Sequence, residues 1–127
     1  MKTVLLDTHS WAWSLTGDER LSEKAAYAMT RAEIVLVSPI SFFEIGQKVR
    51  LGKWPEMQPC VEKLVELLEE QGGCVASLDP SICLAAATMD WAQRDPFDRL
   101  LAATAARYNL PIISMDAIFD GIVPRIW

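Results

Sequence analysis

The sequence predicts a single α/β domain with a mostly parallel central sheet of four to five strands, flanked by helices on both faces. Short apolar runs alternate with longer segments of helical periodicity, which is the pattern of strands joined by crossover helices. The run 34–37 contains only β-branched residues and Leu, as in a buried strand. The length of 127 residues suits one compact domain, so we expect residues 1–127 to form one unit.

The N-terminal half is predicted to contain two strands and four helices. The first strand covers 3–6, and a helix over 8–15 closes at Gly17. Ser22 caps a second helix that reaches about residue 32, before the strand at 34–37. Ser41-Phe42-Phe43-Glu44 has the form of a capping box, which predicts a helix from Ser41 to residue 51 that ends at Gly52. Apolar residues at helical spacing over 61–68 predict the fourth helix.

The C-terminal half repeats one device for starting a helix. Asp79-Pro80 and Asp95-Pro96 each place a capping acid before a proline at the first helical position. These pairs predict helices that reach about residues 89 and 108. Strands are expected at 74–78 and 111–114, with a last edge strand at 123–127 because Pro124 is tolerated only at a sheet edge.

Composition bounds the partners and the compartment. The chain has 12 Lys and Arg against 17 Asp and Glu, a net charge of −5, which taken alone argues against a nucleic-acid partner. Three cysteines without CxxC spacing indicate neither a zinc site nor a disulfide framework. No apolar stretch is long enough for a signal-peptide core or a membrane span. We therefore expect a cytoplasmic protein with no membrane partner.

Four acidic residues fall where a parallel sheet places its functional crevice, beyond the carboxyl ends of the strands. Asp7 and Asp116 follow strands, whereas Glu44 and Asp98 lie in predicted first turns of helices. Each acid alone has a structural explanation as a cap, a capping-box partner or a turn residue. Together, clustered carboxylates repel one another unless a cation lies between them, and Mg²⁺ and Mn²⁺ prefer such oxygen ligands. The residues thus predict a metal-dependent phosphodiesterase or phosphatase.

Four segments occur in this order along the chain: Leu5-Leu6-Asp7-Thr8-His9, Ser38-Pro39-Ile40-Ser41-Phe42-Phe43-Glu44-Ile45, Arg94-Asp95-Pro96-Phe97-Asp98-Arg99-Leu100-Leu101 and Ile113-Ser114-Met115-Asp116. Together they resemble the PIN-domain ribonucleases, above all the VapC-type toxins of type II toxin–antitoxin modules. The resemblance implies a Mg²⁺- or Mn²⁺-dependent endoribonuclease that forms a homodimer and is neutralised by a small antitoxin. It also implies that Asp7, Glu44, Asp98 and Asp116 are the catalytic, metal-binding quartet. Gln93 stands where this subgroup often has His, and Ser114 where Thr is common.

Four further residues are predicted to contact the RNA substrate: Thr8, Arg99, Lys48 and Arg50. The Thr8 hydroxyl either orients a ligand or stabilises the start of its helix. Arg99 either pairs with an acid or reaches a phosphate. Lys48 and Arg50 belong to the densest basic stretch, which is either an RNA-backbone contact or a solvated helix face.

Other polar and aromatic residues near these positions have simpler explanations. Asp95 is expected to cap the helix that starts at Pro96, or to support Asp98. Asp120 is expected to be a surface turn acid, and His9 a partly exposed helix residue rather than a general base. Trp11 and Trp13, two residues apart, are expected to face different ways, with at least one in the core and the other available for a partner interface.

Two competing functions are weighed against the ribonuclease. A receiver or phosphatase domain needs paired acids after the first strand and a late lysine, but Asp7 stands alone and no lysine follows Lys63. The second is a non-catalytic PIN-like scaffold that binds RNA or protein, against which the intact quartet argues. The quartet supplies four of the five net negative charges, so the low pI reflects the predicted site more than the rest of the surface.

Overall fold

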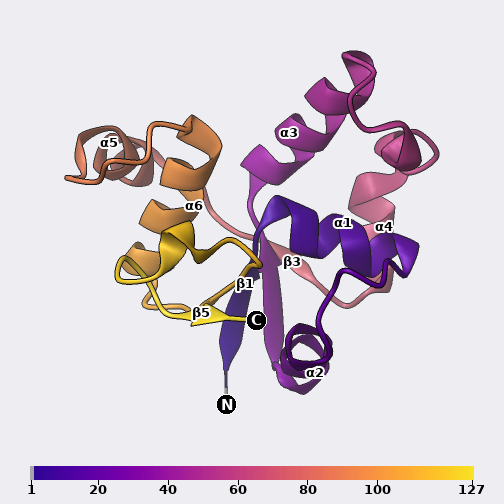
Figure 1. Cartoon of the computed structure of the whole chain (residues 1–127), viewed down its shortest axis with the longest axis horizontal. Helices are drawn as coiled ribbons and strands as arrows, with labels where there is room; N and C mark the ends of the chain where they lie inside the picture. Colours follow the sequence, from indigo (N-terminus) through magenta and orange to yellow (C-terminus); the bar gives the residue numbers. More distant parts are fainter. Residues whose placement is uncertain (1) are drawn as a thin grey trace.

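The computed structural model describes residues 2–127 and contains one sheet of five parallel strands in the order β3-β2-β1-β4-β5 (Figure 1). All four neighbouring pairs are parallel, so every strand ends at the same edge of the sheet. The predicted α/β class and the strand count are confirmed. The strands are β1 (Thr3–Leu6), β2 (Ile34–Val37), β3 (Cys74–Val75), β4 (Ile112–Ile113) and β5 (Arg125–Ile126).

Helices cover both faces of this sheet, as the sequence predicts. In Figure 1, α1 and α4 lie on the opposite side of the strands from α5 and α6. The helices of the first face are α1 (Thr8–Thr16), α2 (Glu23–Arg31), α3 (Pro39–Arg50) and α4 (Leu64–Glu70). On the second face, α6 (Pro96–Arg107) packs on the sheet and α5 (Pro80–Thr88) packs on α6. Short 3₁₀ turns are η1 (Pro55–Met57), η2 (Val61–Lys63) and η3 (Ala117–Phe119).

Alternation along the strands creates two hydrophobic cores. Val4 and Leu6 of β1 join a cluster with Trp11, whereas Leu5 joins Leu101 of α6 on the other face. Successive side chains of a strand point to opposite faces, so a strand with both faces covered is apolar throughout. Trp11, Leu5 and Leu6 are at most 1% exposed. Strand β1 is therefore the fixed centre from which the site is built.

Strand β2 is buried only at its carboxyl end. Val37 is fully buried, but Ile34 at the other end is 44% exposed, so the prediction of a buried strand holds for part of this segment.

Local capping signals account for most helix starts. Asp7, Ser22, Asp79 and Asp95 each accept a hydrogen bond from a backbone N–H in the first turn of the helix that follows. Three of these caps were predicted as caps, and Asp7 was predicted as a site residue that is also able to cap. At the end of α1, Gly17 has φ of +64°, a conformation in which glycine has no steric penalty.

The start of α3 corrects the predicted capping box. Helix α3 begins at Pro39, and its cap is Ser38, whose side chain accepts from the N–H of Ile40 at 3.1 Å. Proline fixes φ and lacks an N–H, so it suits the first helical position. The helix therefore begins two residues before the predicted start at Ser41. Ser41 therefore lies inside the helix. Glu44 falls in its second turn and is not a capping-box partner.

Three strands are shorter than predicted because their partners end. The segment 74–78 forms a strand only at Cys74–Val75, since Val75 pairs with Val37, the last residue of β2. The segments 111–114 and 123–127 are likewise reduced to two residues each, in register with the end of β1. Strand β5 does lie at an edge, as predicted from Pro124. No helix among residues 2–127 is long and apolar enough to cross a membrane.

Candidate active site

All four predicted acids line one cavity of about 580 Å³ beyond the carboxyl ends of the strands. Asp7 directly follows β1 and Asp116 is the third residue after β4, while Glu44 and Asp98 come from α3 and α6. We call this cavity the cleft. The sequence prediction that the four acids share one edge of the sheet therefore agrees with the structure.

Asp7 is held rigidly at the floor of the cleft. Its Oδ1 accepts from the backbone N–H of Ser10 at 2.9 Å, and its Oδ2 accepts from the Ser114 hydroxyl at 2.6 Å. Burial raises the pKa of Asp7 above its ordinary value, while the hydrogen bonds from Ser10 and Ser114 act in the opposite direction. The carboxylate is thus desolvated and fixed in orientation by neutral donors.

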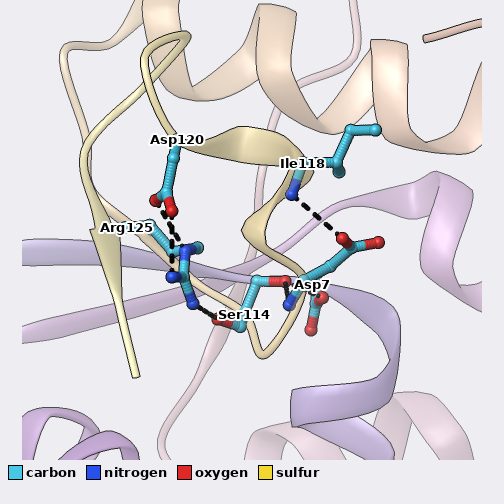
Figure 2. Close-up of polar contacts among 6 residues, drawn as sticks. Asp7, Ser114, Ile118, Asp120 and Arg125 are labelled. Atoms are coloured by element: carbon cyan, nitrogen blue, oxygen red, sulfur yellow. Dashed lines mark hydrogen bonds and ion pairs between the residues drawn. The ribbon is translucent and has the colours of Figure 1, made fainter.

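Ser114 joins two of the acids. Besides donating to Asp7, its hydroxyl accepts from the N–H of Asp116 at 3.0 Å. Figure 2 shows Ser114 between Asp7 and Arg125, whose Nη1 donates to the Ser114 carbonyl at 3.1 Å. In the sequence, Ser114 stands out only because Thr is common at this position. No local signal indicates that it links two segments 107 residues apart.

Asp120 lies outside the cleft and pairs with Arg125. The guanidinium of Arg125 donates to both Asp120 oxygens, at 2.7 and 3.1 Å (Figure 2). This pair lowers the pKa of Asp120. The predicted role as a surface turn acid is the one that the structure gives it.

Glu44 is buried and has a single cationic neighbour. Its side chain is 9% exposed, and Oε2 accepts from Lys48 Nζ at 2.8 Å, one helical turn later on the same face of α3. Lys48 also lies 5.5 Å from the ring centre of Trp54 and lines the cleft, and its contact with a substrate stays a prediction. Arg50 is exposed and does not line the cleft, so the structure does not bring it to the predicted substrate site.

Asp98 is the acid most affected by the others. Burial raises its pKa to about 7, with further contributions from the carboxylates of Asp95, Asp116, Glu44 and Asp7. Its Oδ2 accepts from Gln93 Nε2 at 2.7 Å. Asp95 caps α6 by accepting from the N–H of Phe97 and also lines the cleft, so it adds a fifth negative charge there.

Arg99 has a different role from the one predicted. Its guanidinium points away from the acids and donates to the backbone carbonyls of Ala86, Met89, Trp91 and Gln93. These contacts fix the segment between α5 and α6. Because four of its five donors are used in this way, Arg99 is corrected from a substrate contact to a structural residue.

Thr8 lines the cleft but is only 2% exposed. Its hydroxyl lies 2.9 Å from that of Ser41, a contact that ties α1 to α3. Inside α3, Ser41 is therefore a partner of Thr8. A contact between Thr8 and the substrate stays a prediction.

A second wall of the cleft, which we call the basic wall, is aromatic and basic. The exposed ring of His9 stacks on Trp54 with centroids 4.7 Å apart, and desolvation followed by the charge of Lys48 lowers its pKa. Arg20 lies 5.0 Å from the ring centre of Trp13 and pairs with Asp18 at 2.7 Å. Arg20 reaches the cleft from the turn after α1, a position that has no signal in the sequence.

Both tryptophans of α1 are buried, Trp11 fully and Trp13 to 5% exposure. Trp11 Nε1 donates to Gln71 at 2.9 Å, whereas the buried Trp13 Nε1 has no hydrogen-bond partner among residues 2–127. Trp13 packs against His9 and the C-terminal Trp127. The structure therefore does not support the expectation that one of the two serves a partner interface.

The donor set of the cleft suits a hard divalent cation. Across residues 2–127, no three Asp, Glu, His or Cys side chains are grouped closely enough to hold a metal ion as they stand. Mg²⁺, however, keeps several waters and typically takes only one or two carboxylates from a protein. Burial and then the repulsion of neighbouring carboxylates raise the pKa of Asp98, and a cation relieves this repulsion, so the carboxylates fit such an ion by their chemistry.

Comparison with solved structures supports the fold. A toxin-antitoxin complex from Klebsiella pneumoniae matches with a TM-score of 0.66 and 13% identity, over 98% of this chain and 96% of that one. VapBC2 from Rickettsia felis, bound to a DNA fragment from its promoter, gives a TM-score of 0.67 at 12% identity, over 97% and 96%. FitAB bound to an IR36 DNA fragment gives 0.62 at 20% identity, over 96% and 92%.

Comparison with sequences identifies the family. The chain is 30% identical over 117 residues to Ribonuclease VapC22 of Mycobacterium tuberculosis (strain ATCC 25618 / H37Rv), which covers 91% of this chain and 88% of that protein. Residues 4–123 match the family model of the PIN domain. A receiver or phosphatase domain is thereby set aside. This chain belongs to the PIN-domain family.

Proposed function

We propose that this protein is a Mg²⁺- or Mn²⁺-dependent endoribonuclease and the toxin of a type II toxin–antitoxin module. One observation carries the proposal: Asp7, Glu44, Asp98 and Asp116, from four separate segments, line one cleft where their charges act on one another. The relation to a ribonuclease from M. tuberculosis supports the same activity.

The carboxylates would hold the ion, with Asp98, Asp116 and Asp7 as ligands and Glu44 completing the site directly or through water. When bound, the ion supplies Lewis-acid chemistry and neutralises negative charge on the scissile phosphate. Ser114 fixes the Asp7 carboxylate and the backbone of Asp116 relative to each other. The protein thereby preorganises the acids before any cation arrives.

The basic wall would hold the RNA backbone. Lys48 and Arg20 line the same cleft as the acids and are the only Lys and Arg of residues 2–127 that do so. A cation beside the acids allows a polyanion to approach them, and such contacts position the chain without reading its sequence. The net charge of −5 therefore does not argue against RNA, because four of these charges belong to the site.

The proposed partners follow from the family. The structural neighbours include a toxin-antitoxin complex, and we propose that this chain likewise binds a cognate antitoxin, forms a homodimer and acts in the cytoplasm. Co-purification tests this part: a short antitoxin encoded beside the gene should form a stable complex with the protein and abolish RNA cleavage.

The activity is tested with purified protein and a fluorophore-quencher RNA oligonucleotide. We expect cleavage with Mg²⁺ or Mn²⁺, none with EDTA, and none after Asp7→Asn combined with Asp98→Asn. Asp120→Asn is a matched control, because Asp120 lies outside the cleft and pairs with Arg125. RNA binding without cleavage under all metal conditions would instead identify a non-catalytic scaffold.

A further inference from the structure

The segment between α5 and α6 is organised around Asp98 and Arg99. Arg99 holds it by donating to the carbonyls of Trp91 at 2.9 Å and Gln93 at 2.6 Å, as well as to two carbonyls at the end of α5. Four hydrogen bonds from one guanidinium fix the backbone of this segment. Arg99, the neighbour of Asp98 in the sequence, therefore fixes the backbone from which the Gln93 side chain extends.

The orientation of the Gln93 amide is set by its partners. Its Oε1 accepts from the N–H of Arg94 at 2.9 Å and from the N–H of Asp95 at 3.3 Å. Only the carbonyl oxygen of an amide accepts hydrogen bonds, so the NH₂ group must lie on the other side. That NH₂ group donates to Asp98 Oδ2 at 2.7 Å. The two ends of one side chain thus connect the α6 cap to the Asp98 carboxylate.

We propose that Gln93 is a positioning residue that orients Asp98 for the divalent cation, an inference that rests on the proposed function of Asp98. Gln93 occupies Oδ2, and Oδ1 has no hydrogen-bond partner within residues 2–127. The carboxylates of Asp95, Asp116 and Glu44 repel that of Asp98, so the hydrogen bond from Gln93 helps to hold the Asp98 carboxylate beside them. A neutral amide holds it without supplying the positive charge that a lysine would, and so leaves that charge to the metal.

Gln93→Asn separates this role from support of the loop. Asn accepts readily from the N–H two residues later, which preserves the contact with Asp95, but its amide is one methylene too short to reach Asp98 as well. We expect Gln93→Asn to weaken Mn²⁺ binding by roughly 10- to 100-fold, measured by electron paramagnetic resonance of free Mn²⁺. At saturating Mn²⁺, kcat should fall while KM for RNA is unchanged.

Three comparisons decide the result. Gln93→His, whose ring N–H has a similar reach, should recover most of the Mn²⁺ affinity. Gln71→Asn is the matched control. The amide of Gln71 likewise accepts one hydrogen bond, from Trp11, and donates another, to Ser14, but Gln71 does not line the cleft. The inference is overturned if Gln93→Asn binds Mn²⁺ within twofold of the parent, or if Gln71→Asn weakens Mn²⁺ binding equally.

The same titration on Asp98→Asn distinguishes failure of this inference from failure of the proposed site. If Asp98→Asn loses Mn²⁺ affinity and Gln93→Asn does not, only the role of Gln93 is wrong. If Asp98→Asn binds Mn²⁺ as the parent does, Asp98 is not a ligand and the inference fails with it.

Discussion

The two walls of the cleft treat charge in opposite ways. On the acidic wall, Asp7, Asp98 and Asp116 are held by hydroxyl, amide and backbone donors, and no salt bridge within residues 2–127 joins them to Lys or Arg. On the basic wall, Lys48 is paired with Glu44 and Arg20 with Asp18, and both cations lie over tryptophan rings.

The difference shows where an external charge is needed. Neutral donors orient carboxylates without cancelling their repulsion, so the acidic wall reaches charge balance only with a bound cation. The basic wall is already balanced, and its cations are fixed in place by carboxylates and aromatic faces. We expect metal removal to affect the first wall and ionic strength to affect the second. Variants of Asp98 and Lys48 test this division.

The largest effect is expected from Asp98→Asn. The substitution keeps the volume and the hydrogen bond from Gln93 but removes a charge from the acidic wall. RNA cleavage should fall by at least about 10²- to 10³-fold, the scale for losing one charge-stabilising group of an active site. Initial rates with saturating Mn²⁺ measure it. A loss of less than tenfold would show that Asp98 is not part of the catalytic machinery.

Lys48→Met should act on substrate binding. It removes a cation of the basic wall, so KM for RNA should rise by roughly 10-fold or more, with a smaller change in kcat, since a hydrogen bond to a charged group contributes about 1.5–3 kcal/mol. The dependence of binding on salt should also weaken, by about one phosphate contact. Fluorescence anisotropy at several salt concentrations measures both, with the exposed Lys63→Met as the control. Equal KM values for the two variants would exclude Lys48 from the RNA contact.

The two tryptophans of α1 should differ in what their N–H groups contribute to stability. Trp11→Phe removes a hydrogen bond to Gln71, whereas Trp13→Phe removes an N–H that has no partner within residues 2–127. Urea denaturation should show Trp11→Phe to be less stable than Trp13→Phe by about 1 kcal/mol or more. The reverse order would mean that the Trp13 N–H is satisfied in solution.

The smallest effect concerns the metal-free protein. The folded-state pKa of Asp98 is about 7, above its ordinary value of 3.8, so ionisation of this carboxyl destabilises the fold increasingly from about pH 4 to about pH 7. Asp98→Asn removes this penalty. In EDTA at pH 8 the variant should melt a few degrees higher than the parent, on the order expected for a local charge change, and the gap should close near pH 4. Melting points that coincide at pH 8 would argue against the raised pKa of Asp98, and so against the burial and repulsion that cause it.

The sequence correctly predicts those features of the fold that depend on neighbouring residues. Asp79-Pro80 and Asp95-Pro96 are local signals that specify the first residues of two helices. The acids after β1 and β4 share one edge of the sheet because parallel strands end at the same edge. Ser38 and Ser41 lie on either side of Pro39, and each has a side chain that is able to cap a helix. Ser38 is the cap because Pro39 takes the first helical position.

The sequence does not predict contacts between residues that only the folded chain brings together. Arg99 could pair with an acid or reach a phosphate by its place beside Asp98, and only the folded α5–α6 segment supplies the carbonyls that it contacts. Gln93 and Arg20 depend likewise on loops whose conformation no spacing specifies. Ser114 contacts Asp7 across 107 positions, a pairing set by the order of strands in the sheet.

We propose that the acidic wall holds a divalent cation. An X-ray structure of crystals grown with Mn²⁺ tests this, because anomalous scattering locates the ion without assumptions about its ligands. We predict a peak in the cleft within coordination distance of Asp98 and at least one of Asp7 and Asp116. No peak in the cleft, in protein that cleaves RNA with Mn²⁺, would contradict the claim.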